Sequence, residues 1–181
     1  MDDKRARFEA QVLPHLDAAY RFARWLARSG ADVDDLVQEA FLRAYRGFDR
    51  LRGGDVKAWV FAIVRNCHAT AMRQQQRRAS VSLPDEHAEQ TVAGALAAVP
   101  DPESASLAAD EQRTLERLIA ALPPEYREVL LLREMEDMSY REIAVVTAVP
   151  IGTVMSRLAR ARAALRTRYL ESSPGEPRAV R

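Results

Sequence analysis

The chain contains 181 residues, of which 48% are hydrophobic, and it carries a formal net charge of +1. This length is enough for one or two small cores, but no apolar run reaches the roughly 18 residues of a membrane-spanning helix. The charged N-terminus is not followed by the apolar stretch of a signal peptide. A single cysteine, Cys67, excludes an internal disulfide and a multi-cysteine zinc site. We therefore expect a soluble, cytoplasmic protein.

The charge is unevenly distributed along the chain. Its net value is +5 over residues 1–79, −6 over 80–123 and +2 over 124–181. Two basic ends around an acidic middle favour two anion-binding modules joined by a solvated connector.

Apolar residues recur at helical spacing through residues 8–48. We expect a break at Pro14 and the end of a helix at 29–30. Asp32 or Asp34 is placed to cap a second helix. Its buried stripe is predicted to contain Val37, Ala40, Phe41, Ala44, Tyr45 and Phe48.

A third helix is expected after the loop at residues 52–54, with Asp55 as its cap. It ends in the basic segment 73–78. No stretch of the sequence alternates as a strand does, so the pattern predicts an all-α fold. One side of this third helix would carry Val56, Trp59, Ile63 and Cys67.

Residues 80–110 differ in composition from the rest, with three prolines, many alanines, serines and acids, and no aromatic residue. We expect a flexible linker, with at most a weak helical turn near 92–99. Helices resume beyond it, and Pro124 suits the first turn of one of them. Apolar positions on these helices are Leu115, Leu118, Ile119, Leu122, Tyr126, Val129 and Leu130.

Residues 139–142 form a capping box, in which Ser139 and Glu142 each bond to the other's backbone amide. A short helix follows, then a tight break at 148–150, then a helix that begins near Ile151. The buried seam of this last helix is predicted to contain Ile151, Val154, Leu158, Ala161 and Leu165.

The last helix is basic on a different face. No acidic residue lies between Glu142 and Glu171, whereas five arginines do. A short helix, a tight turn and an acid-free basic helix are typical of a DNA-binding helix-turn-helix. A helical hairpin with a solvated basic face is the alternative.

Two sets of segments resemble the extracytoplasmic-function (ECF) group of sigma-70 transcription factors. The first set is 34–45 (DDLVQEAFLRAY) and 58–66 (AWVFAIVRN). The second is 122–129 (LPPEYREV), 139–144 (SYREIA) and 150–158 (PIGTVMSRL). The resemblance implies a region-2 domain, a flexible acidic linker, a region-4 helix-turn-helix domain and a disordered tail. The corresponding bounds are 1–79, 80–110, 111–171 and 172–181.

The resemblance also implies a function. Such a protein binds core RNA polymerase, at the clamp of the beta-prime subunit and at the beta flap, and recognises the −10 and −35 promoter elements while helping to melt the DNA. It is not an enzyme, needs no cofactor or metal, and takes no small-molecule substrate. An anti-sigma factor usually controls it and can hold it near the membrane.

The resemblance assigns three groups of site residues. Polymerase docking falls to Asp35, Gln38, Glu39 and Arg43. The downstream, melted element falls to Arg52, Lys57, Trp59, Arg65, Asn66, Arg73, Arg77 and Arg78. The upstream element falls to Thr153, Met155, Ser156, Arg157, Arg160 and Arg162.

Some of these assignments have alternatives. Core packing competes with base contact for Trp59 and Phe61, because most aromatics in a helix stripe are buried. Met155 departs from the Lys or Arg that many members carry, and it can touch a thymine methyl but cannot donate to guanine. Ala148 stands where a turn glycine is frequent, which predicts a turn without a left-handed residue.

Three other classes of protein are alternatives to the interpretation as a sigma factor. A helix-turn-helix regulator that works without polymerase explains only the second half of the chain. An enzyme would need a site, but the three histidines are scattered and no Gly-rich phosphate loop occurs. A helical adaptor would give no sequence-selective DNA protection.

Overall fold

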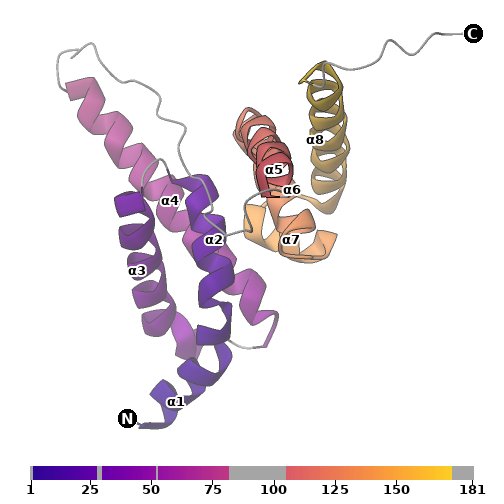
Figure 1. Ribbon diagram of the computed structural model, residues 1–181. Helices are drawn as coiled ribbons and strands as arrows, with labels where there is room; N and C mark the ends of the chain where they lie inside the picture. The colour runs from indigo at the N-terminus through magenta and orange to yellow at the C-terminus, as the bar shows by residue number, and fades with distance from the viewer. Residues whose placement is uncertain (1, 28–29, 52, 82–104, 173–181) are drawn as a thin grey trace, which may run out of the picture.

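The computed structural model describes residues 2–27, 30–51, 53–81 and 105–172, and every element within them is a helix. This confirms the all-α prediction. Figure 1 shows two neighbouring groups of helices, which we call the N-terminal and C-terminal units. The N-terminal unit contains α1 (Asp2–Gln11), η1 (Leu13–His15), α2 (Leu16–Leu26), α3 (Gly30–Gly47), η2 (Phe48–Arg50) and α4 (Val56–Val81). The C-terminal unit contains α5 (Ala105–Ala120), α6 (Pro124–Glu134), α7 (Tyr140–Thr147) and α8 (Ile151–Ser172).

Helix α5 begins at Ala105, inside the segment that was predicted to be a linker. Helix α4 reaches Val81 and so also enters that segment. Residues 82–104, with the helical turn predicted near 92–99, lie outside the described residues, as do residues 173–181 of the predicted tail. Ser172, the first residue of that tail, ends α8.

The N-terminal unit forms where α2, α3 and α4 pack against one another. Phe22 and Phe61 lie in its centre, with ring centroids 5.2 Å apart. Phe8 of α1 meets Tyr45 and Phe48 edge-on, at 5.1 and 5.5 Å, a geometry that aromatic quadrupoles favour. Pro14 lies in the short η1 that separates α1 from α2, as the predicted break requires.

Of the two helix caps predicted in this unit, one is confirmed and one is wrong. Asp55 caps α4 as expected, since its Oδ1 accepts from the Ala58 amide at 2.8 Å. The expectation that Asp32 or Asp34 begins α3 is wrong, because α3 already begins at Gly30. The carboxylate of Asp34 instead accepts from the Tyr20 hydroxyl at 2.9 Å and so joins α3 to α2.

The predicted inner stripe of α4 is only partly right. Cys67 is buried, but Val56, Trp59 and Ile63 are half-buried. The fully buried positions are Val60, Phe61 and Val64. The reason is tertiary, because α4 packs on α2 and α3 and also on α7, and so is covered on more than one face.

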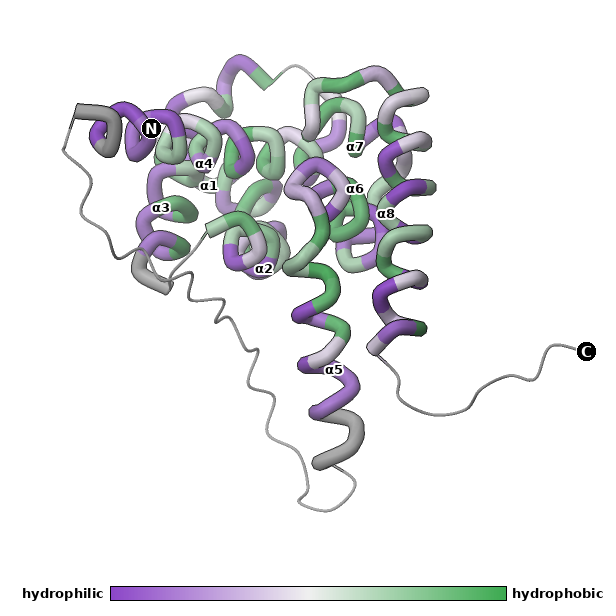
Figure 2. The backbone as a smooth tube through the Cα atoms, turned by 90° about the horizontal axis from the view of Figure 1, so that it is seen from above, coloured by the Kyte–Doolittle hydropathy of each residue, from purple (hydrophilic) through white to green (hydrophobic). Residues whose placement is uncertain are grey.

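In the C-terminal unit, α6, α7 and α8 pack together around Val129, Leu132, Ile143 and Leu158. Pro124 begins α6 as predicted. Helix α5 packs on α8 and extends away from the rest of the unit, as Figure 2 shows from above. Within the described residues, no single helix is both long and apolar enough to cross a bilayer.

Ile151 is the exception to the predicted seam of α8. It is 42% exposed, whereas Val154, Leu158 and Ala161 are buried. Ile151 is the first residue of α8, where the chain has just turned by 99° from α7. Only from Val154 onward is the seam covered.

The turn between α7 and α8 differs from its prediction. Ala148 ends α7 in the left-handed region, at φ 53° and ψ 40°, so the expectation of a turn without a left-handed residue is wrong. The left-handed residue turns the chain back, so that the Val149 amide also donates to the Ala144 carbonyl, at 3.3 Å, and closes the helix. Alanine is strained in this conformation because its Cβ approaches the backbone.

We expect Ala148→Gly to stabilise the protein by about 0.5–1 kcal/mol, because relief of the left-handed strain outweighs the greater chain entropy of glycine. Ala148 is exposed, so little packing is lost. Urea denaturation followed by circular dichroism measures the change. Ala163→Gly, at an exposed position within α8, is the control and should destabilise by up to about 1 kcal/mol. A loss of stability in Ala148→Gly would contradict the strain argument.

The two units share an interface in this structure. Helix α7 packs against α4, and α6 meets α2. Buried apolar residues of both units belong to one continuous cluster, to which Phe61 and Val64 contribute from one side and Ile143 and Val146 from the other.

Candidate nucleic-acid interface

The helix-turn-helix is formed by α7 and α8. Ser139 begins α7 with the predicted capping box, since its hydroxyl accepts from the Glu142 amide at 3.3 Å and the Glu142 carboxylate accepts from the Ser139 amide at 2.5 Å. The 99° bend between α7 and α8 falls in the range typical of the motif. The cap and the bend together fix the orientation of α8 relative to α7.

The predicted upstream contacts divide by exposure. Met155, Ser156 and Arg160 are exposed on α8, whereas Thr153 and Arg157 are half-buried. The Ser156 hydroxyl donates to the Thr153 carbonyl at 3.0 Å within the helix. The exposed side chains are therefore available to a groove that receives the first turns of α8.

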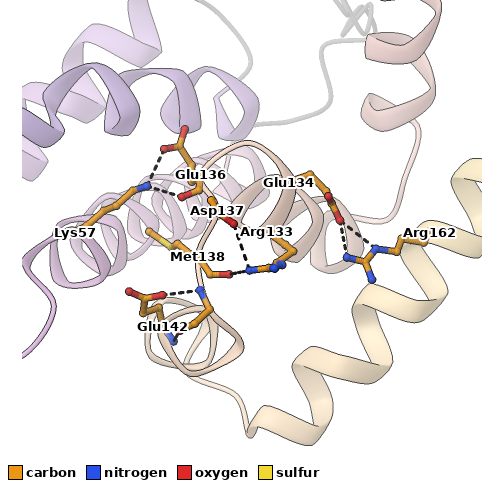
Figure 3. Close-up of polar contacts among 9 residues, drawn as sticks. Lys57, Arg133, Glu134, Glu136, Asp137, Met138, Glu142 and Arg162 are labelled. Atoms are coloured by element: carbon orange, nitrogen blue, oxygen red, sulfur yellow. Dashed lines mark hydrogen bonds and ion pairs between the residues drawn. The ribbon is translucent and has the colours of Figure 1, made fainter.

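Arg162 has a protein partner. Its Nη2 and Nε lie 2.6 and 3.1 Å from one carboxylate oxygen of Glu134 at the end of α6, as Figure 3 shows. Both side chains are about half-exposed, so this ion pair contributes little to stability. Water or a DNA phosphate can replace the Glu134 carboxylate beside Arg162.

Lys57 and Arg65, which were predicted to hold the downstream element, are both paired with carboxylates of the C-terminal unit. The Lys57 ammonium donates to the Glu136 carbonyl at 2.5 Å and lies 3.3 Å from its carboxylate, which Figure 3 shows. Arg65 donates to the Glu128 carboxylate at 2.5 Å. Burial raises the pKa of Glu128, and the charges of Arg65 and Arg157 oppose that rise.

The other predicted downstream residues lie along α4. Asn66 is exposed, and Trp59 is half-buried with its ring against the core. Further along the helix, Arg73, Arg77 and Arg78 are exposed. Arg73 donates to the Ala69 carbonyl at 3.0 Å. Arg52 lies outside the described residues.

The predicted docking residues lie together on α3. Asp35 and Gln38 are exposed, and Glu39 accepts from Arg43 at 2.6 Å. Asp35 and Glu39 also line a pocket of about 400 Å³ between α3 and α4, together with Asp32, Leu36, Cys67, His68, Met72 and Arg78. Its lining combines three acidic side chains with apolar ones and with the basic Arg78. Across the described ranges, no three or more His, Cys, Asp and Glu side chains gather where they could hold a metal ion.

Glu128, Glu136 and Arg21 were not predicted as site residues. Glu128 lies four residues before the buried Leu132 on α6, so helical periodicity could have placed it on the inner face. Glu136 lies after the end of α6, where no periodicity applies. The partners of both acids are more than 60 residues away in sequence, and the sequence carries no signal for such pairs.

Comparison with protein-family models gives two matches. The model described as Sigma-70 region 2 matches residues 12–78, and the model described as Sigma-70, region 4 matches residues 112–165. The first match covers most of the N-terminal unit, and the second covers the helix-turn-helix and α6.

Several curated proteins are similar to the chain. It is 38% identical over 137 residues to the ECF RNA polymerase sigma-E factor of Escherichia coli K12, an alignment that covers 74% of this chain and 72% of that protein. It is 33% identical over 169 residues to the ECF RNA polymerase sigma factor SigE of Mycolicibacterium smegmatis, covering 91% and 62%.

Solved structures are similar as well. The sigma factor RpoE of Bartonella quintana, in complex with the anti-sigma factor NepR, matches with a TM-score of 0.76 and 27% identity, covering 92% of this chain and 99% of that one. CnrH, in complex with the cytosolic domain of CnrY, matches in fold with a TM-score of 0.63 and 23% identity, covering 93% and 91%.

Proposed function

Because the chain belongs to the ECF RNA polymerase sigma factors of the sigma-70 family, we propose that its two units divide promoter recognition between them. Sigma factors are transcription initiation factors and not enzymes. In this proposal the N-terminal unit, as region 2, docks on core polymerase and captures the melted −10 element. The C-terminal unit, as region 4, reads the −35 element in duplex DNA and contacts the beta flap. The protein acts in the cytoplasm, where the polymerase is.

Upstream recognition is assigned to α8. Its first turns expose Met155, Ser156 and Arg160, and no acidic side chain on α8 before Glu171 repels the phosphates. Arginine forks can bind phosphates or guanine edges with two hydrogen bonds, and hydroxyls can bind either. Met155 offers an apolar contact to a thymine methyl.

Downstream capture is assigned to α4. Opening a duplex costs a few kcal/mol per unstacked base, so the open strand needs a partner that holds an extruded base. The exposed amide of Asn66 can both donate to and accept from a base edge. Arg73, Arg77 and Arg78 follow on the same helix and supply charge for the strand backbone.

Docking on the polymerase clamp is assigned to the exposed face of α3, with Asp35, Gln38, Glu39 and Arg43. These side chains lie off the buried stripe of the helix, so a partner can reach them without unfolding the unit. The acidic pocket beside them favours a partner surface that carries basic side chains.

An anti-sigma factor is the proposed regulator. The relative RpoE was solved in complex with the anti-sigma factor NepR, and the shared fold gives this chain comparable surfaces. Attachment of that regulator to a membrane would hold the complex near it.

The observation that carries the proposal is the presence of two basic helices, α4 and α8, on separate units of one chain. A reconstituted assay tests it. Core polymerase with the purified protein is expected to start transcription at defined sites, and each subunit should co-purify with the protein. Binding to DNA without any binding to core polymerase would favour a simple helix-turn-helix regulator instead.

We expect Asn66→Ala to impair promoter opening more than closed-complex binding, because the amide acts only after the base leaves the stack. Permanganate reactivity of unpaired thymines measures opening, and footprinting at low temperature measures closed-complex binding. Gln76→Ala, which removes the same group about 15 Å further along α4, is the control. Equal losses in both measurements would count against the role of Asn66.

A further inference from the structure

Two acidic side chains of the C-terminal unit are buried against cations of the N-terminal unit. The Glu136 side chain is 5% exposed and lies 3.3 Å from both Lys57 of α4 and Arg21 of α2. The Glu128 side chain is 9% exposed and contacts Arg65 of α4 at 2.5 Å. All of these ion pairs cross the interface between the units.

Lys57 and Arg65 are also residues to which we assign the downstream DNA strand. A cation holds a phosphate through the same N–H groups that it gives to a carboxylate. While Glu136 and Glu128 occupy them, Lys57 and Arg65 cannot bind DNA with full strength. The two carboxylates thus stand where phosphates would stand.

Buried charges make this contact an all-or-none element. A carboxylate that loses its partner while it stays buried strongly destabilises the protein, whereas one that returns to water loses little. Glu128 and Glu136 lie on and just after α6, so they leave the interface together when the C-terminal unit moves away. The interface is therefore either closed with both sites paired or open with both solvated.

We propose that Glu128 and Glu136 form a carboxylate latch, which holds the two units closed and withholds Lys57 and Arg65 from promoter DNA until the units separate. The inference rests on the proposed role of α4 in binding the downstream strand. Because only the open form binds, the apparent affinity of the free protein for DNA is reduced by the fraction of molecules that are closed.

The test uses the full-length double variant Glu128→Gln/Glu136→Gln, which keeps side-chain size and removes both charges. The matched control is Glu111→Gln/Glu125→Gln, which removes the same net charge from exposed positions of the C-terminal unit. Arg21→Gln weakens the latch from the other side without changing the C-terminal unit. Circular dichroism verifies that each variant is helical.

Two quantities are measured on each protein. Small-angle X-ray scattering gives the radius of gyration, and fluorescence anisotropy gives the affinity for a single-stranded oligonucleotide of the downstream element. We expect the double variant to expand and to bind the oligonucleotide about tenfold more tightly than the parent. Arg21→Gln should change in the same direction by less, and the control pair should match the parent.

An unchanged radius of gyration in both the double variant and Arg21→Gln would overturn the latch. So would equal tightening of DNA binding in the control pair, because net charge alone would then explain it. An expanded double variant whose holoenzyme fails to bind promoter DNA would contradict the proposed function while supporting the latch.

Discussion

Replacing Phe61 with alanine is expected to lower the free energy of unfolding by about 3–5 kcal/mol. The side chain is 0% exposed and its ring lies against Phe22. Truncation removes apolar area from the core and leaves a cavity between α2 and α4, which the surrounding helices can fill only in part. Urea denaturation followed by circular dichroism measures the loss.

Two further variants set the scale for this result. Phe61→Leu keeps most of the apolar volume and should cost clearly less. Leu42→Ala on α3 removes an apolar side chain that is 46% exposed, and its effect should stay within about 0.5 kcal/mol. A loss below about 1 kcal/mol for Phe61→Ala would mean that this ring is not a core residue and would restore base contact as its role.

Replacing Arg157 with alanine is expected to weaken promoter binding by about 1–3 kcal/mol if the guanidinium reads a base of the upstream element. Arg157 lies in the second turn of α8, half-buried and aligned with Thr153 one turn before it. A contact to a base edge is lost outright on truncation, because a methyl group cannot donate to guanine. Affinity and footprint are measured with the holoenzyme.

The comparison that separates base reading from charge uses two duplexes and a second variant. The parent should distinguish the natural upstream element from one with substituted bases, whereas Arg157→Ala should bind both with similar affinity. Arg166→Ala removes the same charge about 13 Å further along α8, and it should weaken both duplexes alike. An unchanged footprint and affinity for Arg157→Ala would exclude it as a base contact.

The features that the sequence predicted correctly are those with short-range causes. The capping box at Ser139, the cap at Asp55 and the first-turn proline at Pro124 each act within a few residues. These sequence patterns therefore predict the local structure correctly without knowledge of how the rest of the chain packs. The helix-turn-helix could be predicted because it consists almost wholly of such local features.

The features that the sequence could not predict depend on packing between distant segments. The buried face of α4 is wider than one stripe because α7 covers it from the other unit. Ile151 has the right spacing for the seam but stands at a helix end that no neighbour buries. The pairing of Glu128 with Arg65 joins segments whose separation leaves no trace in either local pattern.

Ala148 was mispredicted for a different reason. A residue type constrains backbone conformation only through its energetic cost, and one alanine in the left-handed region costs about 1–2 kcal/mol. The capped α7 and the buried Val154 and Leu158 of α8 fix the turn strongly enough to bear that cost.

The single thiol of the chain has a consequence for how the protein meets oxidants. Cys67 lies in the core beside α3, and burial raises its pKa, so the sulfur stays protonated at neutral pH. Peroxides and disulfides react with thiolates, and they react slowly with a protonated thiol. An oxidative stimulus therefore has no fast route through this thiol, and a gene programme that responds to thiol oxidation would have to receive its signal through a separate sensor molecule.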